Sequence, residues 1–289
     1  MTALRDDVRA GRSALWANPA YTPAADPVAR ADLDRARADW DMLAPLLARL
    51  FPELEASGGR VTSDLIPAPA GAFGDPAGTL LIKGDHALPV AGSIKARGGL
   101  FEVFMCAVTQ ARAAGVLTPD APVTDLANMR DFFAARTIAV GSTGNLGLSV
   151  GIAARALGYA CVVHMSNDAK PWKVDRLRKL GVQVVLHTAD YSTAVAAARD
   201  ATAGDPDSYF VDDESSELLF RGYSTAAAEL AAQLDAMGIV IGPNRPLCLY
   251  LPCGIGGAPG GIAYGARAVF GPHAHSFFVE PQQSASALC

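Results

Sequence analysis

Apolar residues follow helical spacing in some parts of the chain and form short runs in others, which divides the sequence into predicted elements. Residues 28–50 place their large apolar side chains near helical spacing and predict a helix. The Pro- and Gly-rich run 66–78 predicts a loop, and the apolar residues 79–85 predict a short buried strand. Within 92–115 the apolar positions again suit a helix, which should begin near Ser93.

From residue 137 onward, apolar runs alternate with segments of helical periodicity. The runs predict strands at 137–142, 160–166, 182–187, 208–213, 246–254 and 276–281. The segments between them predict helices at about 145–157, 170–180, 192–203, 217–237 and 262–270. Gly158 and Gly181 stand where helices are expected to stop. Strands separated by helices favour right-handed crossovers, so the pattern predicts an α/β fold with parallel sheets.

Composition narrows the possible partners. Of 289 residues, 51% are hydrophobic and 18% are charged, which favours a large folded core over a disordered or fibrous chain. The net charge of -5 is spread along the chain without a Lys/Arg run, so neither nucleic acid nor a membrane is an expected partner. The N-terminus has no apolar leader region, and a cytoplasmic location is expected.

The five cysteines are scattered along the sequence and include no CxxC pair. This spacing predicts neither a disulfide framework nor a zinc site. The three adjacent carboxylates Asp212, Asp213 and Glu214 end a predicted strand, where side chains alternate in direction. They cannot all converge on a metal ion, so a role at a helix start is expected for them. We expect no metal site.

Lys95 is the first candidate for chemistry. It follows a Gly-Ser pair at the predicted helix start, within G-S-I-K-A-R-G-G. The partial positive charge of a helix N-terminus disfavours a protonated amine, which makes this lysine suited to nucleophilic imine formation. A solvent-exposed lysine at a helix start would have the same local sequence. By contrast, Trp172 and Lys173 open another predicted helix and are expected to pack or face solvent.

Two loops between a strand and a helix are candidate anion sites. In GSTGNLG (141–147), small residues allow backbone N–H groups to converge at a helix start, which suits a substrate carboxylate, and Asn145 adds a side-chain donor. In CGIGGAPGG (253–261), the glycines permit close approach of a phosphate. Each loop alone is also compatible with an ordinary tight turn. The second lacks both the dinucleotide and the nucleoside-triphosphate patterns, which leaves a monophosphate.

A reactive lysine, a carboxylate loop and a phosphate loop are together the parts that a pyridoxal-phosphate (PLP) enzyme acting on an amino acid requires. Four segments, in order, also carry a resemblance to a known family: VAGSIKARGGLFEVF, GSTGNLGLSVGIAARALGYACVVHMSNDAKPWKVDRLRKLG, FVDDESSELLFRGYS and LYLPCGIGGAPGGIAYG. In them the chain is similar to the bacterial D-serine dehydratases, fold-type II PLP enzymes related to tryptophan synthase β and threonine dehydratase.

The resemblance implies a role for each motif. Lys95 matches the lysine that forms the Schiff base with PLP. The loop that holds the substrate carboxylate is matched by Ser142, Thr143, Gly144 and Asn145, of which Asn145 also lies near the cofactor's phenolic oxygen. The phosphate loop is matched by Gly254, Ile255, Gly256, Gly257 and Ala258. Ala258 stands where relatives often have a further glycine.

The implied activity is the conversion of D-serine to pyruvate and ammonia. The same chemistry on L-serine or L-threonine is an alternative, because the residues themselves do not reveal stereochemistry. The resemblance also implies a smaller α/β domain at 95–212 and a larger PLP-binding domain at 1–94 plus 213–289, with a helical N-terminal extension.

Members of this family continue well past a position equivalent to Cys289. We therefore expect that a C-terminal part is missing, including the residue that faces the pyridine nitrogen. A non-catalytic PLP-binding fragment is accordingly a second alternative. The side chains of Phe277 and Val279 on the last predicted strand are expected to be open to water.

Overall fold

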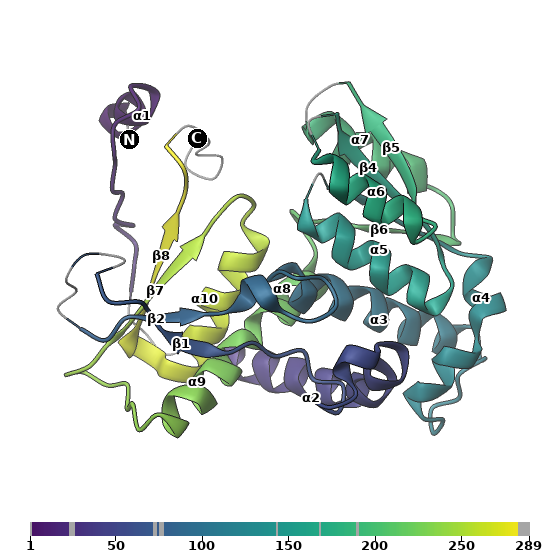
Figure 1. Cartoon of the computed structure of the whole chain (residues 1–289), viewed down its shortest axis with the longest axis horizontal. Coiled ribbons are helices and arrows are strands. Elements are labelled where there is room, and N and C mark those ends of the chain that lie inside the picture. Colours follow the sequence, from purple (N-terminus) through teal and green to yellow (C-terminus); the bar gives the residue numbers. More distant parts are fainter. Residues whose placement is uncertain are drawn as a thin grey trace.

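The fold has two lobes, with two helices between them that carry residues of the candidate site (Figure 1). It is known from a computed structural model, which describes residues 2–22, 27–71, 74, 78–142, 144–167, 169–188 and 191–282. The two helices between the lobes are α3 (Lys95–Ala113) and α8 (Glu217–Ser224). Among the helices that are described, none has the length and apolar character that a membrane span requires.

One lobe contains a four-stranded parallel sheet in the order β5-β4-β3-β6. Its strands are β3 (Thr137–Gly141), β4 (Ala160–Ser166), β5 (Gln183–His187) and β6 (Ser208–Val211). The helices of this lobe are α4 (Arg130–Ala134), α5 (Asn145–Leu157), α6 (Pro171–Lys179) and α7 (Tyr191–Thr202). The sequence predicted this parallel arrangement, with element ends within two residues, but it did not predict α4. Gly158 and Gly181 both have positive φ where α5 and α6 end, as expected.

The other lobe contains a second parallel pair, β7 (Leu247–Pro252) and β8 (Ala274–Val279), joined by α10 (Gly257–Phe270). The predicted start of α10 at residue 262 was wrong, because glycine-rich segments are usually loops. Here the glycines allow α10 to pack closely on α8: a Cβ on Gly261 would lie 2.5 Å from the Phe220 carbonyl oxygen, and one on Gly265 would lie 2.1 Å from that of Ser224.

A separate two-stranded antiparallel sheet consists of β1 (Leu65–Pro67) and β2 (Leu81–Lys83). The predicted loop at 66–78 was wrong at its first two residues, which belong to β1. Pro67 is the last residue of β1, a position where a missing N–H is tolerated. In β8, Phe277 and Val279 are exposed as expected, and Phe277 stacks on Tyr250 of β7.

The single helix predicted at 217–237 is divided into α8 and α9 (Ala226–Ala236). The break falls at two hydroxyl residues: Ser224 donates to the carbonyl of Arg221 at 2.7 Å, and Thr225 donates to that of Gly222 at 2.8 Å. Such bonds compete with the regular helical pattern and bend or interrupt a helix.

The remaining elements lie mainly toward the N-terminus. They are the helices α1 (Thr2–Arg9) and α2 (Pro27–Leu50) and the short 3-10 helices η1 (Pro52–Leu54), η2 (Asp85–Ala87), η3 (Val123–Asn128) and η4 (Gly271–His273). One continuous hydrophobic core includes buried residues of α2, α3, α5 and the four-stranded sheet. The helix α3 is buried along most of its length within that core. Because buried side chains are closely packed, the position of its first residue, Lys95, is fixed.

Candidate active site

The starts of α3, α5 and α10 are held near one another by specific contacts. The hydroxyl of Ser149 on α5 donates to the Lys95 carbonyl at 2.9 Å, which ties α5 to the first residue of α3. Asp213 connects α3 to α10: its carboxylate binds Lys95, and its carbonyl oxygen lies 3.2 Å from where a Cβ on Gly257 would stand. The structure thus gathers the three motifs that the sequence singled out.

Lys95 is the first residue of α3 and is paired with a buried carboxylate. Its Nζ lies 3.0 Å from Oδ1 and 3.3 Å from Oδ2 of Asp213, whose side chain is only 7% exposed. The ammonium also lies 5.4 Å from the ring centroid of Tyr223, within the range of a cation–π interaction. The helix-start role expected for Asp213 was wrong, because Ser216 caps the following helix α8 and the fold places the Asp213 carboxylate against Lys95.

The alternation of side chains along the Asp212–Glu214 run is nevertheless observed. Asp212 pairs with Arg199 of α7 at 2.9 Å, whereas Asp213 pairs with Lys95. The side chains of Asp212 and Asp213 therefore point to opposite sides of the segment. Among the residues that the structure describes, no group of three or more His, Cys, Asp or Glu side chains could hold a metal ion.

Two buried hydroxyls close to Lys95 lack a hydrogen-bond partner within the described residues. They are Ser93 Oγ, two residues before Lys95, and Tyr223 Oη. Burial, followed by the charges of Asp213 and Glu102, raises the pKa of Tyr223 well above its ordinary value, so this hydroxyl stays protonated. Buried polar groups are normally paired, so these two unpaired hydroxyls fit a ligand with several polar atoms. PLP meets that description.

The glycine-rich segment begins as a turn and continues as the first turn of α10. Gly254 and Gly256 have open space where a Cβ would stand, whereas Gly257 is crowded by Asp213. Ala258 is buried, which agrees with a small side chain being tolerated there. Ile255 lies between the two open glycines and is half-buried. Because the first N–H groups of a helix have no partner within it, the start of α10 is suited to a phosphate.

Cys253 shows that the Lys95 charge reaches this segment. Burial, followed by the charge of Glu280, raises the pKa of the Cys253 thiol, and the charge of Lys95 opposes this increase. The thiol therefore stays protonated, in agreement with the small core residue that the sequence suggested. Lys95 therefore lies close enough to influence Cys253, the residue that directly precedes the phosphate loop.

The expected carboxylate loop lies at the start of α5. Gly144 donates its N–H to Ser142 Oγ at 3.2 Å and stands at the N-cap position of α5, where no side chain caps the helix. Asn145 is exposed, and Thr143 lies outside the described residues. The ammonium of Lys173, for which we expected only packing or exposure, lies 4.0 Å from the position of a Cβ on Gly144. Burial, and then the charge of Lys170, lowers the pKa of Lys173.

A buried ionic network supports α3 two residues beyond Lys95. Arg97, with only 3% of its side chain exposed, binds Asp85 at 2.9 Å and Glu229 at 2.7 Å. Lys83 binds Glu229 as well, at 2.5 Å. Although burial favours the neutral acid, the hydrogen bond and charge of Arg97 prevail and lower the pKa of Glu229. The contacts of Glu229 join residues far apart in the sequence, so no local sequence pattern predicts them.

The chain matches one protein family and is similar in sequence to several known proteins. The family model of the pyridoxal-phosphate dependent enzymes matches residues 59–288. A probable D-serine dehydratase from Rhizobium etli (strain CIAT 652) is 57% identical over 296 residues, which cover 98% of this chain and 66% of the relative. One from Hahella chejuensis (strain KCTC 2396) is 48% identical, covering 100% of this chain and 68% of the relative. The chain thus spans about two thirds of the length of these relatives.

Among solved structures, the apo form of Escherichia coli diaminopropionate ammonia lyase has a similar fold. Its TM-score is 0.70 at 20% sequence identity, with 91% of this chain and 68% of the other covered. At this identity the likeness concerns the fold alone. It supports the two-lobed arrangement of parallel sheets described above.

Proposed function

Because the chain belongs to the pyridoxal-phosphate-dependent enzymes and, among them, to the D-serine dehydratase family, we propose that it converts D-serine to pyruvate and ammonia. The substrate loses its β-hydroxyl as water, and a water molecule later releases the nitrogen as ammonia. When bound, PLP supplies an aldehyde for imine formation and a ring that accepts the electrons left at Cα after proton loss.

The observation that carries this proposal is the position of Lys95 at a helix start, 3.0 Å from the buried carboxylate of Asp213. Lys95 is the residue for covalent attachment of the cofactor and for moving a proton at the substrate Cα. Asp213 is placed to take or hold a proton at Lys95 Nζ. Tyr223 provides the aromatic surface beside that amine.

The two loops are assigned to the anionic groups. Gly254, Ile255, Gly256, Gly257 and Ala258 bind the cofactor phosphate through backbone N–H groups at the start of α10. Ser142, Thr143, Gly144 and Asn145 bind the substrate carboxylate at the start of α5. This places both anions at helix N-termini, at the carboxyl ends of strands, where α/β folds bind ligands.

Product release tests the proposal. The purified protein with PLP is incubated with D-serine, L-serine or L-threonine at equal concentration, and pyruvate or 2-oxobutanoate is measured. We expect the fastest release from D-serine and none from a Lys95→Ala variant, with Lys179→Ala as a control at an exposed site on α6. Equal or faster turnover of an L-amino acid would reassign the substrate, and PLP binding without turnover would identify a non-catalytic fragment.

A further inference from the structure

Glu102 is a buried carboxylate on α3, seven residues after Lys95, and the function proposed above gives it no role. The residue is 1% exposed. Its two oxygens accept hydrogen bonds from different elements: Oε1 from the hydroxyl of Tyr209 on β6 at 2.9 Å, and Oε2 from the hydroxyl of Ser216 at 2.6 Å. No cation forms an ion pair with Glu102 anywhere in the described ranges. Isolated buried charges are costly, so this carboxylate needs an explanation.

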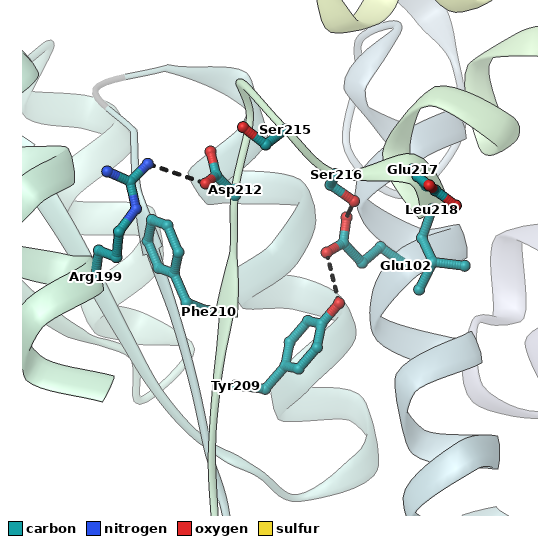
Figure 2. Close-up of a pocket in the computed structure, with 9 residues that line it drawn as sticks. All are labelled: Glu102, Arg199, Tyr209, Phe210, Asp212, Ser215, Ser216, Glu217 and Leu218. Atoms are coloured by element: carbon teal, nitrogen blue, oxygen red, sulfur yellow. Dashed lines mark hydrogen bonds and ion pairs between the residues drawn. The ribbon is translucent and has the colours of Figure 1, made fainter. Parts of the chain in front are cut away.

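The chain segment 212–216 lies beside Glu102 at the edge of a cavity of about 510 Å³ (Figure 2). In Figure 2, Arg199 points toward Asp212 at one end of the segment, and Glu102 points toward Ser216 at the other. Asp213, which pairs with Lys95, lies between these two anchors. A turn hydrogen bond from Ser216 N to the Asp212 carbonyl at 3.0 Å makes the segment a single bend.

The two anchors differ in how firmly they are buried. Arg199 is 48% exposed, so its pair with Asp212 is screened by solvent. The Glu102–Ser216 bond is shielded, because Glu102 is almost fully buried. Ser216 also caps α8 by accepting from Leu219 N at 3.0 Å, so its hydroxyl proton is free to be donated to Glu102.

We propose that Glu102 is a positioning residue that, through Ser216, fixes the bend carrying Asp213 opposite Lys95. The role requires an acceptor on both oxygens, because Tyr209 and Ser216 both donate. Glutamine has the same shape but replaces one acceptor oxygen by an NH2 donor, so the hydroxyl that faces this nitrogen can no longer donate to it and has to reorient. The assignment rests on the proposed function for its effect on turnover, but its effect on the cofactor can be measured without any substrate.

Several groups lie close enough to Glu102 to shift its pKa or to have their own pKa shifted by it. Burial raises the pKa of Glu102, hydrogen bonds from Ser216 and Tyr209 lower it, and the charge of Asp212 raises it again, opposed by a backbone hydrogen bond from Leu219. Cys106 on the same helix and Tyr223 on α8 are close enough for Glu102 to raise their pKa values. None of these neighbours supplies a positive charge, so the carboxylate is held by the two hydroxyl donors together with the backbone N–H of Leu219.

The test compares Glu102→Gln with Glu217→Gln in the PLP-loaded enzyme. Glu217 follows Ser216 directly and its side chain is 85% exposed. Glu217→Gln therefore makes the same change from carboxylate to amide at a position outside the bend. For Glu102→Gln we expect unchanged PLP content and a roughly tenfold lower kcat for D-serine. In a pH titration of the visible absorbance of bound PLP, the midpoint should be about one pH unit lower. The reason is that Asp213 no longer stabilises the positive charge at Lys95 Nζ. Glu217→Gln should behave as the wild type.

A second variant tests the route through Ser216. Ser216→Gly keeps an acceptable helix start but removes the hydroxyl. It should reproduce the lower kcat and the shifted midpoint, and the double variant should be no worse than either single one, since both break the same link. If Glu102→Gln and Ser216→Gly lower only the melting temperature and leave the absorbance titration unchanged, the proposal is wrong. If D-serine is not turned over by the wild type, the function fails, while the absorbance titration still decides the role of Glu102.

Discussion

The carboxylate of Asp213 lies 3.0 Å from Nζ of Lys95, although the two residues are 118 positions apart in the sequence. This pair joins the start of the buried helix α3 to the bend between the two lobes. It also places a proton acceptor at the amine that we assign to cofactor binding. The arrangement therefore links the conformation of the bend to the chemistry at Lys95.

Replacing Asp213 by Asn should lower kcat by about tenfold to a hundredfold, the effect of losing one hydrogen bond to a charged group worth roughly 1.5–3 kcal/mol. PLP content should change much less, since the phosphate loop is untouched. Steady-state kinetics and cofactor absorbance measure the two effects. Asp207→Asn, at a carboxylate that is 57% exposed, is the matched control. Wild-type kinetics in Asp213→Asn would remove this residue from the site.

Asn145→Ala should weaken substrate binding and catalysis more than PLP retention. The reason is its position as the first residue of α5, where we place the substrate carboxylate. A loss of roughly 1.5–3 kcal/mol corresponds to a tenfold to hundredfold decrease in kcat/KM. Kinetics with D-serine, set beside the PLP content of the same samples, separates the two effects. Unchanged kinetics would argue against the carboxylate assignment.

Lys173→Met should raise KM for D-serine by about tenfold, because its ammonium lies beside Gly144 and would lose its attraction for a nearby carboxylate. The effect should disappear with D-serinamide, which has no carboxylate charge. Lys179→Met, at the exposed end of the same helix, makes the same change in net charge and should leave KM unaltered. If both variants raise KM equally, a general charge effect explains the result.

The stability of the protein should depend on pH through Glu102. Burial raises the pKa of this carboxyl from 4.5 to about 7. The folded state therefore binds the proton more tightly than the unfolded state, so the stabilisation is complete below about pH 4.5 and is lost as the pH rises through about 7. The loss amounts to up to about 3 kcal/mol.

Glu102→Gln should remove that dependence, so the difference in free energy of unfolding between variant and wild type should increase from pH 4.5 to pH 7 in favour of the variant. Urea titrations at several pH values measure it. Taking the difference cancels the opposite contribution of carboxyls such as Glu229, whose pKa is lowered. A difference that is constant with pH would contradict the raised pKa.

Hydrophobic periodicity predicted the parallel sheets because most strands and helices of that region have enough residues to show their period, whereas α4, with five residues, was not predicted. It missed β1, which has three residues and ends in Pro67. The early start of α10 was missed for another reason: Gly261 and Gly265 are required there by close packing on α8, which only the folded structure reveals.

The candidate site was predicted in part. Lys95 and the two loops are local motifs, and the resemblance to a family identified them. Asp213, Tyr223 and Lys173 were missed because their importance comes from neighbours distant in the sequence. The alternation of Asp212 and Asp213 was a usable signal, since it implied that one carboxylate faces away from the other.

Lys95 is the residue to which we assign covalent attachment of the cofactor. Reducing the PLP-loaded protein with borohydride makes the imine bond permanent, and peptide mapping by mass spectrometry then locates the pyridoxyl group. We expect a single label on Lys95, and its loss in Lys95→Ala. A label on Lys83 or Lys170 in the wild type would contradict it.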